Sequence, residues 1–228
     1  HTRYISVTGV QTLLFRSVWL FDLDNTLHNA SPHIFPHINR SMTRYLEQHL
    51  GLGLDEANAL RMQYWHRYGA TMLGLMRHHG TDPDHFLVET HRFDRLHEMM
   101  VFERALRGML RALPGRRIVF SNAPRHYAEA VLEIMGVRRL FEDVVGIEDL
   151  DYHPKPGIRA YHSLLQRRRL NAAQCIMLED SAVNLRTAKR LGMRTVLVGG
   201  GLRTPAYVDL RIPNILALRR QLGRLQVR

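Results

Sequence analysis

The hydrophobic pattern of the chain alternates between short apolar runs and longer segments with helical periodicity. The apolar runs, which predict strands, span residues 18–21, 118–120, 143–147, 174–178 and 195–198. They are nearly continuous rather than alternating, which is typical of parallel strands buried on both faces of a sheet. The sequence therefore predicts an α/β protein with a parallel sheet at its centre.

Segments with apolar residues at every third or fourth position lie between the later runs and predict helices. These segments span about residues 105–113, 124–135, 157–168 and 182–191. Strands that alternate with helices and connect through right-handed crossovers form a doubly wound parallel sheet. We therefore predict a doubly wound, Rossmann-like core.

Residues 30–105 differ from the rest of the chain, because no strand candidate is found among them. The periodicity there predicts helices over residues 36–50, 55–68 and 71–79, with Asp55 as an N-cap, and a further helix from about Asp84. We therefore predict two domains. The α/β core comprises residues 1–29 and 106–228, and the inserted helical domain comprises residues 30–105.

The first apolar run stops at two aspartates, Asp22 and Asp24, with Asn25 and Thr26 indicating a loop directly after them. In open α/β sheets the carboxyl ends of the strands form the edge at which ligands bind. Two carboxylates at the end of a buried strand are costly unless a cation lies between them. The pair predicts a metal site with one carboxylate available for chemistry.

Polar residues also follow three later strands: Ser121 and Asn122, then Lys155, then Glu179 and Asp180. In a parallel sheet these residues meet at one edge, so they are expected to lie close to the two aspartates. A carboxylate cannot easily approach a phosphate dianion unless positive charge offsets the repulsion. This set of acids, one lysine and one hydroxyl is what phosphoryl transfer through an aspartyl-phosphate requires. Hard oxygen ligands favour Mg²⁺.

These motifs resemble those of the haloacid dehalogenase-like hydrolase superfamily, in the same order along the chain. The matching stretches are Asp22-Leu23-Asp24-Asn25-Thr26, Ser121, Lys155-Pro156 and Glu179-Asp180. The resemblance implies that Asp22 is the nucleophile and a metal ligand, and that Asp24 is the general acid and base with its backbone carbonyl on Mg²⁺. It implies a phosphate site formed by Ser121, Asn122 and Lys155, and a metal site completed by Asp180 and Glu179.

The helical insert resembles the cap of one branch of that superfamily, and in finer detail the chain resembles the pyrimidine 5′-nucleotidases. The finer match includes the run Tyr64-Trp65-His66-Arg67-Tyr68-Gly69, although His28 stands where that group usually has an aromatic residue. It implies hydrolysis of pyrimidine nucleoside monophosphates, with substrate contacts from His66, Arg67 and Tyr68. The alternative for Tyr64 and Trp65 is that they form the apolar core of the insert.

The composition and net charge predict few further partners or sites. The net charge is +11, but the 32 basic residues are spread along the chain without a basic tail, so we do not expect a nucleic-acid partner. The single cysteine, Cys175, lies in a predicted buried strand and is expected to be structural. The apolar run between Leu13 and Leu23 is short and contains Arg16, so we expect a cytoplasmic protein without a membrane partner.

Three alternatives remain open at the level of sequence. The substrate could be another small phosphate ester, such as a sugar phosphate or phosphoglycolate. A dehalogenase needs no acid at the position of Asp24, so Asp24 argues against that reaction. A non-catalytic protein that binds nucleic acid or an acidic partner would be expected to have lost some of the motif residues, and all are present. The sequence decides neither the preferred ester nor the oligomeric state.

Overall fold

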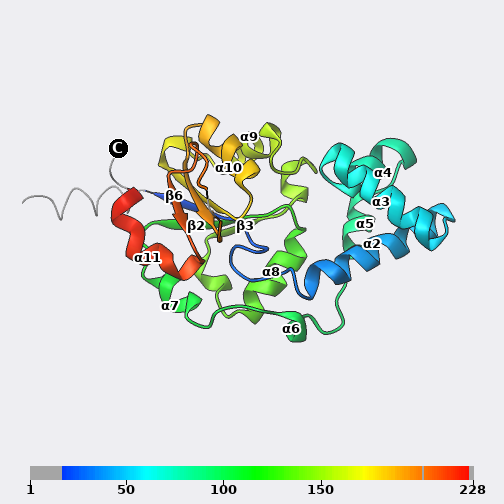
Figure 1. Cartoon of the computed structure of the whole chain (residues 1–228), viewed down its shortest axis with the longest axis horizontal. Coiled ribbons are helices and arrows are strands. Elements are labelled where there is room, and N and C mark those ends of the chain that lie inside the picture. Colours follow the sequence, from blue (N-terminus) through cyan, green and yellow to red (C-terminus); the bar gives the residue numbers. More distant parts are fainter. Residues whose placement is uncertain (1–16, 202, 226–228) are drawn as a thin grey trace, which may run out of the picture.

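The computed structural model describes residues 17–201 and 203–225. A six-stranded sheet, in which every pair of neighbouring strands is parallel, forms the centre of the larger part of the molecule (Figure 1). Its strands lie in the order β3 (Asp143–Val145), β2 (Arg116–Phe120), β1 (Val18–Phe21), β4 (Cys175–Glu179), β5 (Arg194–Val198) and β6 (Leu210–Ile212). The chain builds outward from β1 in both directions, which confirms the predicted doubly wound sheet.

Helices cover both faces of the sheet, so β1 is buried throughout. Trp19 and Phe21 belong to an apolar cluster on one face, and Val18 and Leu20 belong to a second cluster on the other face. The first cluster includes residues of α7 (Leu106–Arg111), α8 (Arg125–Ile134) and α11 (Leu218–Gln221), and the second includes residues of α9 (Ile158–Arg167) and α10 (Ala182–Arg190). Burial on both faces explains why the strands are continuously apolar.

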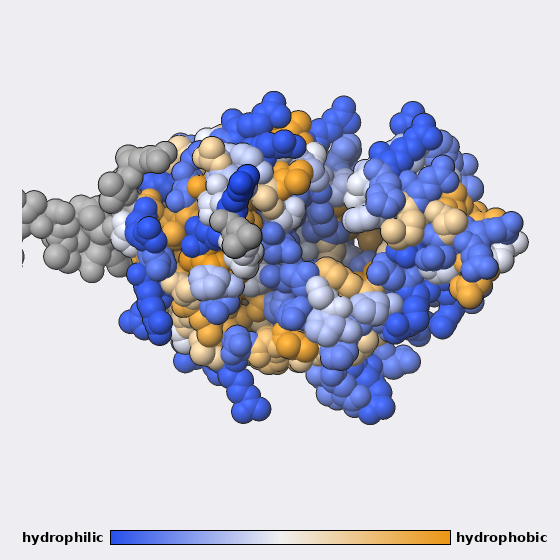
Figure 2. All heavy atoms as spheres, in the orientation of Figure 1, coloured by the Kyte–Doolittle hydropathy of each residue, from blue (hydrophilic) through white to orange (hydrophobic). Residues whose placement is uncertain are grey.

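Between β1 and β2 the described chain contains helices and no strand. They are α7, introduced above, and before it α2 (Ile34–Leu50), α3 (Leu54–Tyr68), α4 (Thr71–His79), α5 (Pro83–Thr90) and α6 (Leu96–Met99). Figure 1 shows α2 to α5 gathered in a lobe beside the sheet, and Figure 2 shows a hollow between this lobe and the α/β part. Leu96 of α6 packs into the apolar cluster that contains α8, although the sequence assigns it to the insert. None of the helices in the described ranges has the length and apolar character needed to cross a membrane.

Several element boundaries differ from the prediction for identifiable reasons. Helix α3 is capped by Gly53, and the Glu56 carboxylate accepts from the Gly53 N–H at 3.2 Å, so the prediction that Asp55 is the N-cap is wrong. Asp82 caps α5, and its side chain accepts from the N–H of Asp84. Strand β6 was not predicted, because three residues with an arginine at the centre do not form an apolar run.

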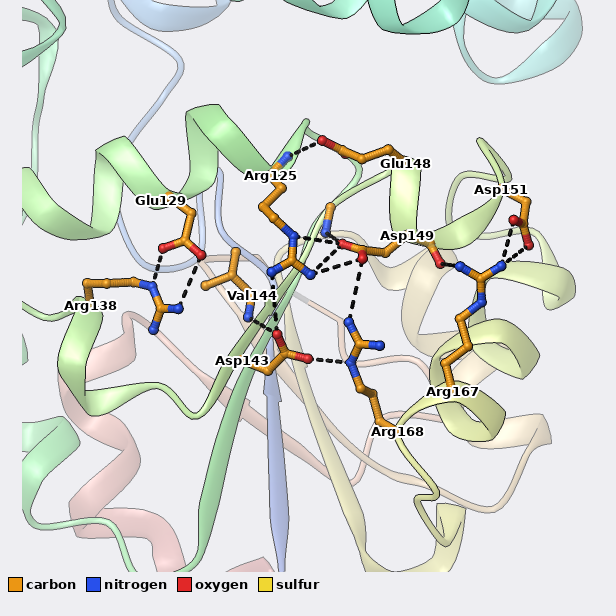
Figure 3. A network of polar contacts seen from close by, with 11 residues as sticks. Arg125, Glu129, Arg138, Asp143, Val144, Glu148, Asp149, Asp151, Arg167 and Arg168 are labelled. Atoms are coloured by element: carbon orange, nitrogen blue, oxygen red, sulfur yellow. Dashed lines mark hydrogen bonds and ion pairs between the residues drawn. The ribbon is translucent and has the colours of Figure 1, made fainter.

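Four charged side chains connect the edge strand β3 to its neighbours (Figure 3). Arg125 of α8 donates to Asp149 at 2.8 Å, and another of its nitrogens lies 3.6 Å from Asp143. Arg168, directly after α9, pairs with Asp143 and lies 3.5 Å from Asp149. The four side chains are only 22–35% exposed, so their charges are less screened than those of an isolated surface pair.

We predict that Asp149→Asn lowers the free energy of unfolding by about 1–2 kcal/mol, because it removes one of the two carboxylate charges that both arginines share. The matched control is Asp151→Asn, whose partner Arg167 is 44% exposed and whose own side chain is 59% exposed. We expect that control to cost less than about 0.5 kcal/mol. Urea denaturation of both variants measures the difference, and equal losses would show that the network adds no more than a surface pair.

Candidate active site

The register of the sheet brings the predicted polar residues to one edge. Phe21 pairs with Leu178 of β4 and with Val119 of β2, and the N–H of Asp22 donates to the Leu178 carbonyl at 3.0 Å. Asp22 therefore lies beside Glu179, just beyond the end of β1. Because β2 and β4 flank β1 and lead away from it in opposite directions, the edge lies where open α/β sheets bind ligands.

Lys155 lies at the centre of this edge with its ammonium group fully engaged. Its Nζ donates to Asp22 Oδ1 at 2.7 Å, to Glu179 Oε2 at 2.9 Å and to the Phe120 carbonyl at 2.7 Å. All three side chains are buried; Lys155 is 3% exposed. A buried ammonium can make three hydrogen bonds, so this lysine is satisfied and joins the ends of β1, β2 and β4.

The charges of this cluster shift one another's proton affinity. Burial, with the Glu179 charge as the next cause, raises the pKa of Asp22 to about 7 despite the nearby ammonium. Burial likewise raises the pKa of Glu179. Burial works to lower the pKa of Lys155, but the Asp22 and Glu179 carboxylates together raise it above its usual range. The Lys155 ammonium therefore does not fully offset the free-energy cost of burying the charged carboxylates.

The arrangement of carboxylates fits a hard divalent cation. Asp22, Glu179 and Asp180 each offer an oxygen, and these oxygens lie within 4.8 Å of one another. Asp180 is exposed, and the pKa of its carboxyl is raised by partial desolvation and by the Asp22 charge. With the Lys155 ammonium included, the cluster carries an excess of two negative charges when its acids are ionised. An all-oxygen donor set of this charge suits Mg²⁺ or Ca²⁺.

The side chain of Asp24 lies in different surroundings from that of Asp22. Asp24 Oδ1 accepts a hydrogen bond from the Tyr127 hydroxyl at 2.6 Å and lies 2.9 Å from His28 Nε2. Between the motif and the following helix, Asn25 adopts a left-handed conformation (φ 62°), and its Oδ1 accepts from the N–H of Ala30 at 3.0 Å. Asp24 thus contacts Tyr127 and His28, whereas Asp22 contacts Lys155.

The second motif contributes one buried hydroxyl and one amide. Ser121 is 2% exposed, and its Oγ accepts from the N–H of Ala123 at 3.0 Å. Asn122 Oδ1 accepts from the N–H of Lys155 at 2.8 Å, and its Nδ2 donates to the Lys155 carbonyl at 3.0 Å. The Asn122 side chain therefore clamps the backbone of Lys155, whereas the sequence assigned this residue to phosphate binding.

The predicted substrate contacts on α3 have varied environments. His66 and Arg67 are exposed, and the Tyr68 hydroxyl lies 2.6 Å from His78 of α4. Tyr64 is buried with its hydroxyl 2.8 Å from His79, and a Cβ at Gly74 would lie 2.2 Å from its ring, so Tyr64 belongs to the interior of the insert. Trp65 is 51% exposed, so the alternative that placed it in that interior is wrong.

A cavity of about 450 Å³ adjoins the carboxylate cluster. Its lining residues are small, aliphatic or charged: Asn25, Asp180, Ala182, Leu197, Val198, Gly199, Gly200, Arg203, Pro205 and Arg211. Arg211 donates to the carbonyls of Gly199, Gly200 and Arg203, so its guanidinium supports the wall. Among residues 17–201 and 203–225, no aromatic ring lines this cavity.

Two residues of the site were not predicted from the sequence as site residues. Tyr127 is separated from Asp24 by 103 positions, and its place on α8 one residue before the apolar stripe gave only a weak signal. His28 was noticed only as a departure from a family pattern. Asp24 and His28 lie at the two ends of a turn and not on a helix, so no helical spacing signalled their contact.

Comparison with known proteins agrees with this geometry. A sequence profile of the haloacid dehalogenase-like hydrolases matches residues 18–192. The chain is 32% identical over 199 residues to the phosphoglycolate phosphatase of Rhodospirillum rubrum, covering 80% of this chain and 79% of that protein. It is 25% identical over 185 residues to fructose-1-phosphate phosphatase YqaB of Escherichia coli, covering 78% and 93%.

The chain is also 26% identical over 198 residues to phosphate metabolism protein 8 of Saccharomyces cerevisiae, covering 80% of this chain but only 61% of the yeast protein. Among solved structures, it is similar to an HAD phosphatase from Thermococcus onnurineus, with a TM-score of 0.65 and 20% identity over 92% of this chain and all of that one. With its fold, its edge of acids and lysine and the profile match all in agreement, the chain belongs to the haloacid dehalogenase-like hydrolase family.

Proposed function

We propose that this protein is a magnesium-dependent phosphomonoesterase that forms an aspartyl-phosphate at Asp22. The observation that carries the proposal is the buried Lys155 ammonium, 2.7 Å from Asp22 and 2.9 Å from Glu179, beside the exposed Asp180. A carboxylate held in this way is fixed in direction at the binding edge of the sheet. Its neighbours are the groups that offset the charge of an incoming phosphate.

In the proposed reaction the Asp22 carboxylate attacks phosphorus and the bond to the ester oxygen breaks. Asp24 gives its proton to that oxygen, so the product leaves as an alcohol. Asp24 then takes a proton from a water molecule, which attacks the phosphoryl group and releases phosphate and Asp22. Ser121 binds one phosphate oxygen, and Lys155 binds another by giving up one of its three present hydrogen bonds. Asn122 holds the Lys155 backbone. Mg²⁺, held by Asp22, Asp180, Glu179 and the Asp24 carbonyl, would supply positive charge for the phosphate dianion.

For the substrate, we favour a small phosphorylated metabolite such as phosphoglycolate or a sugar phosphate. Two relatives are named for phosphatases of such compounds. The described lining of the cavity beside Asp180 contains no aromatic ring on which a base could stack. It contains Arg203, which suits an anionic or polar group. A pyrimidine nucleoside monophosphate is the second candidate, because Trp65 is exposed on α3 next to His66 and Arg67.

We predict that Asp22→Asn lowers the hydrolysis of p-nitrophenyl phosphate with Mg²⁺ by at least about a thousandfold, because the nucleophile is lost. Asp151→Asn, on the exposed ion pair with Arg167, is the charge-matched control and should keep its activity. Circular dichroism checks that both variants fold. Hydrolysis that survives in Asp22→Asn, or a wild-type protein that hydrolyses no phosphomonoester, would contradict the proposal.

A substrate panel tests the preferred ester. We expect kcat/KM for phosphoglycolate or a sugar phosphate to exceed that for UMP, CMP and AMP by about tenfold or more, since no described residue of the cavity lining is aromatic. A preference for UMP and CMP over AMP would instead support the second candidate. If the protein hydrolyses none of these and binds an oligonucleotide in a salt-dependent way, the non-catalytic alternative is correct.

The stability of the folded protein should depend on both Mg²⁺ and pH. Without metal, the pKa of Asp22 rises from 3.8 to about 7 on folding, so the folded state binds more protons than the unfolded state between these values. This group's contribution to stability therefore falls as the pH rises from about 4 to about 7. A cation that replaces the proton relieves the cost, so Mg²⁺ should raise Tm more at pH 8 than at pH 5.

Thermal melts with Mg²⁺ and with EDTA at both pH values measure this difference. Asp180→Asn removes one carboxylate of the cluster and should reduce the Mg²⁺-induced rise at pH 8, whereas Asp151→Asn should not. A rise in Tm of the same size at both pH values, or one that Asp180→Asn leaves unchanged, would show that the ion binds elsewhere.

A further inference from the structure

We infer that Tyr127 and His28 are positioning residues that hold Asp24 by one oxygen and leave the other for the proton transfer. The inference rests on the proposed function, since it concerns the residue proposed there as acid and base. Neither residue contacts the carboxylate cluster directly through a hydrogen bond or ion pair in the described ranges; both act through Asp24.

The two contacts converge on a single atom. The Tyr127 hydroxyl donates to Asp24 Oδ1 at 2.6 Å, and His28 Nε2 lies 2.9 Å from the same oxygen. Tyr127 is 1% exposed and the His28 side chain is fully buried, whereas the Asp24 side chain keeps 15% of its surface exposed. Within residues 17–201 and 203–225, Asp24 Oδ2 has no hydrogen-bond partner. The carboxylate is therefore anchored on its inner side and accessible on the other.

This asymmetry matches what an acid and base requires. A carboxylic acid carries its proton on one oxygen, and its other oxygen accepts hydrogen bonds whether or not the acid is ionised. With two donors on Oδ1, the proton is carried on Oδ2, where a leaving oxygen or a water molecule can reach it. Burial, with the Asp24 charge as the next cause, raises the pKa of Tyr127 above its usual range, so the hydroxyl stays a donor.

The surroundings of His28 indicate that its buried ring serves to contact Asp24. Its Nδ1 is buried without a hydrogen-bond partner among the described residues, so the ring makes its polar contact through Nε2. The tautomer with the proton on Nε2 donates to Asp24 and leaves Nδ1 without a proton to satisfy. Folds rarely retain an unsatisfied buried polar atom, and functional sites are where such exceptions concentrate.

The Tyr127 ring is itself fixed by residues from the helical insert. Phe93, on the segment after α5, stacks on Tyr127 with ring centroids 5.5 Å apart, and His37 of α2 stacks on Phe93 at 4.5 Å. The His91 ring also lies near the Tyr127 ring, with centroids 5.7 Å apart and planes tilted by 59°. A stack of three rings thus connects α2 to the hydroxyl that holds Asp24.

The test uses two esters that differ in their need for an acid. The 2,4-dinitrophenolate group leaves without a proton, whereas an alkoxide needs one. Tyr127→Phe should lower kcat for the best alkyl phosphate of the panel by about tenfold or more. It should change the first-turnover release of dinitrophenolate by less than about twofold. Single-turnover measurement is required because Asp24 also acts in the second step.

Two controls separate positioning from a structural effect. Tyr161→Phe removes a buried hydroxyl that donates to the Asn184 carbonyl at 2.8 Å, and it should affect both esters equally. In an Asp24→Asn background, Tyr127→Phe and His28→Leu should each cause no further loss, because they act through the missing carboxylate. His28→Leu alone should repeat the ester-dependent loss, which provides a test if Tyr127→Phe does not fold.

Equal losses with both esters, or equal losses in both backgrounds, would overturn the inference. If Asp24→Asn itself shows no dependence on the leaving group, the acid role in the proposed function fails. If Asp24→Asn shows that dependence and neither Tyr127→Phe nor His28→Leu does, only the present inference fails.

Discussion

The rest of the site depends on one buried interaction, the contact of the Lys155 ammonium with Asp22 and Glu179. Removing two carboxylates and an ammonium from water is costly, and the attraction offsets that cost only when hydrogen bonds satisfy every group. Here all three donors of Lys155 are used, and the third goes to the Phe120 carbonyl. The carboxylates still exceed the positive charge, and in the proposed function this excess attracts a cation and, through it, a phosphate.

Hydrogen bonds to backbone groups hold this interaction in place. Asp22 stays in line with β4 through the Leu178 carbonyl, and Asn122 clamps the Lys155 backbone at both its N–H and its carbonyl. Asp24, two residues after Asp22 and just before the turn at Asn25, contacts Tyr127 instead. Two aspartates that are two positions apart in sequence therefore come to differ in charge environment and in proposed role.

The sequence was sufficient for five of the six strands in the described ranges and for the edge where their polar residues meet. Buried parallel strands are continuously apolar, and their polar ends share one side. The sequence could not predict the partners of Asp24, since the Tyr127 contact depends on how α8 packs against the turn after β1. The ionic links at β3 were equally hidden, because Arg125, Asp143 and Arg168 carry no pairing signal in sequence. Trp65 shows the limit of periodicity, which cannot decide whether a face of a helix in the insert is covered.

The central claim is that Asp22 becomes phosphorylated. Wild-type protein can be mixed with Mg²⁺ and 2,4-dinitrophenyl phosphate, quenched within the first turnover and reduced with borohydride, which converts an aspartyl-phosphate into homoserine. Peptide mass analysis then locates the converted residue. We expect the aspartate at position 22 to be converted into homoserine, and only when both substrate and metal are present. Turnover without any converted aspartate, or conversion at Asp24, Asp180 or another acid, would contradict it.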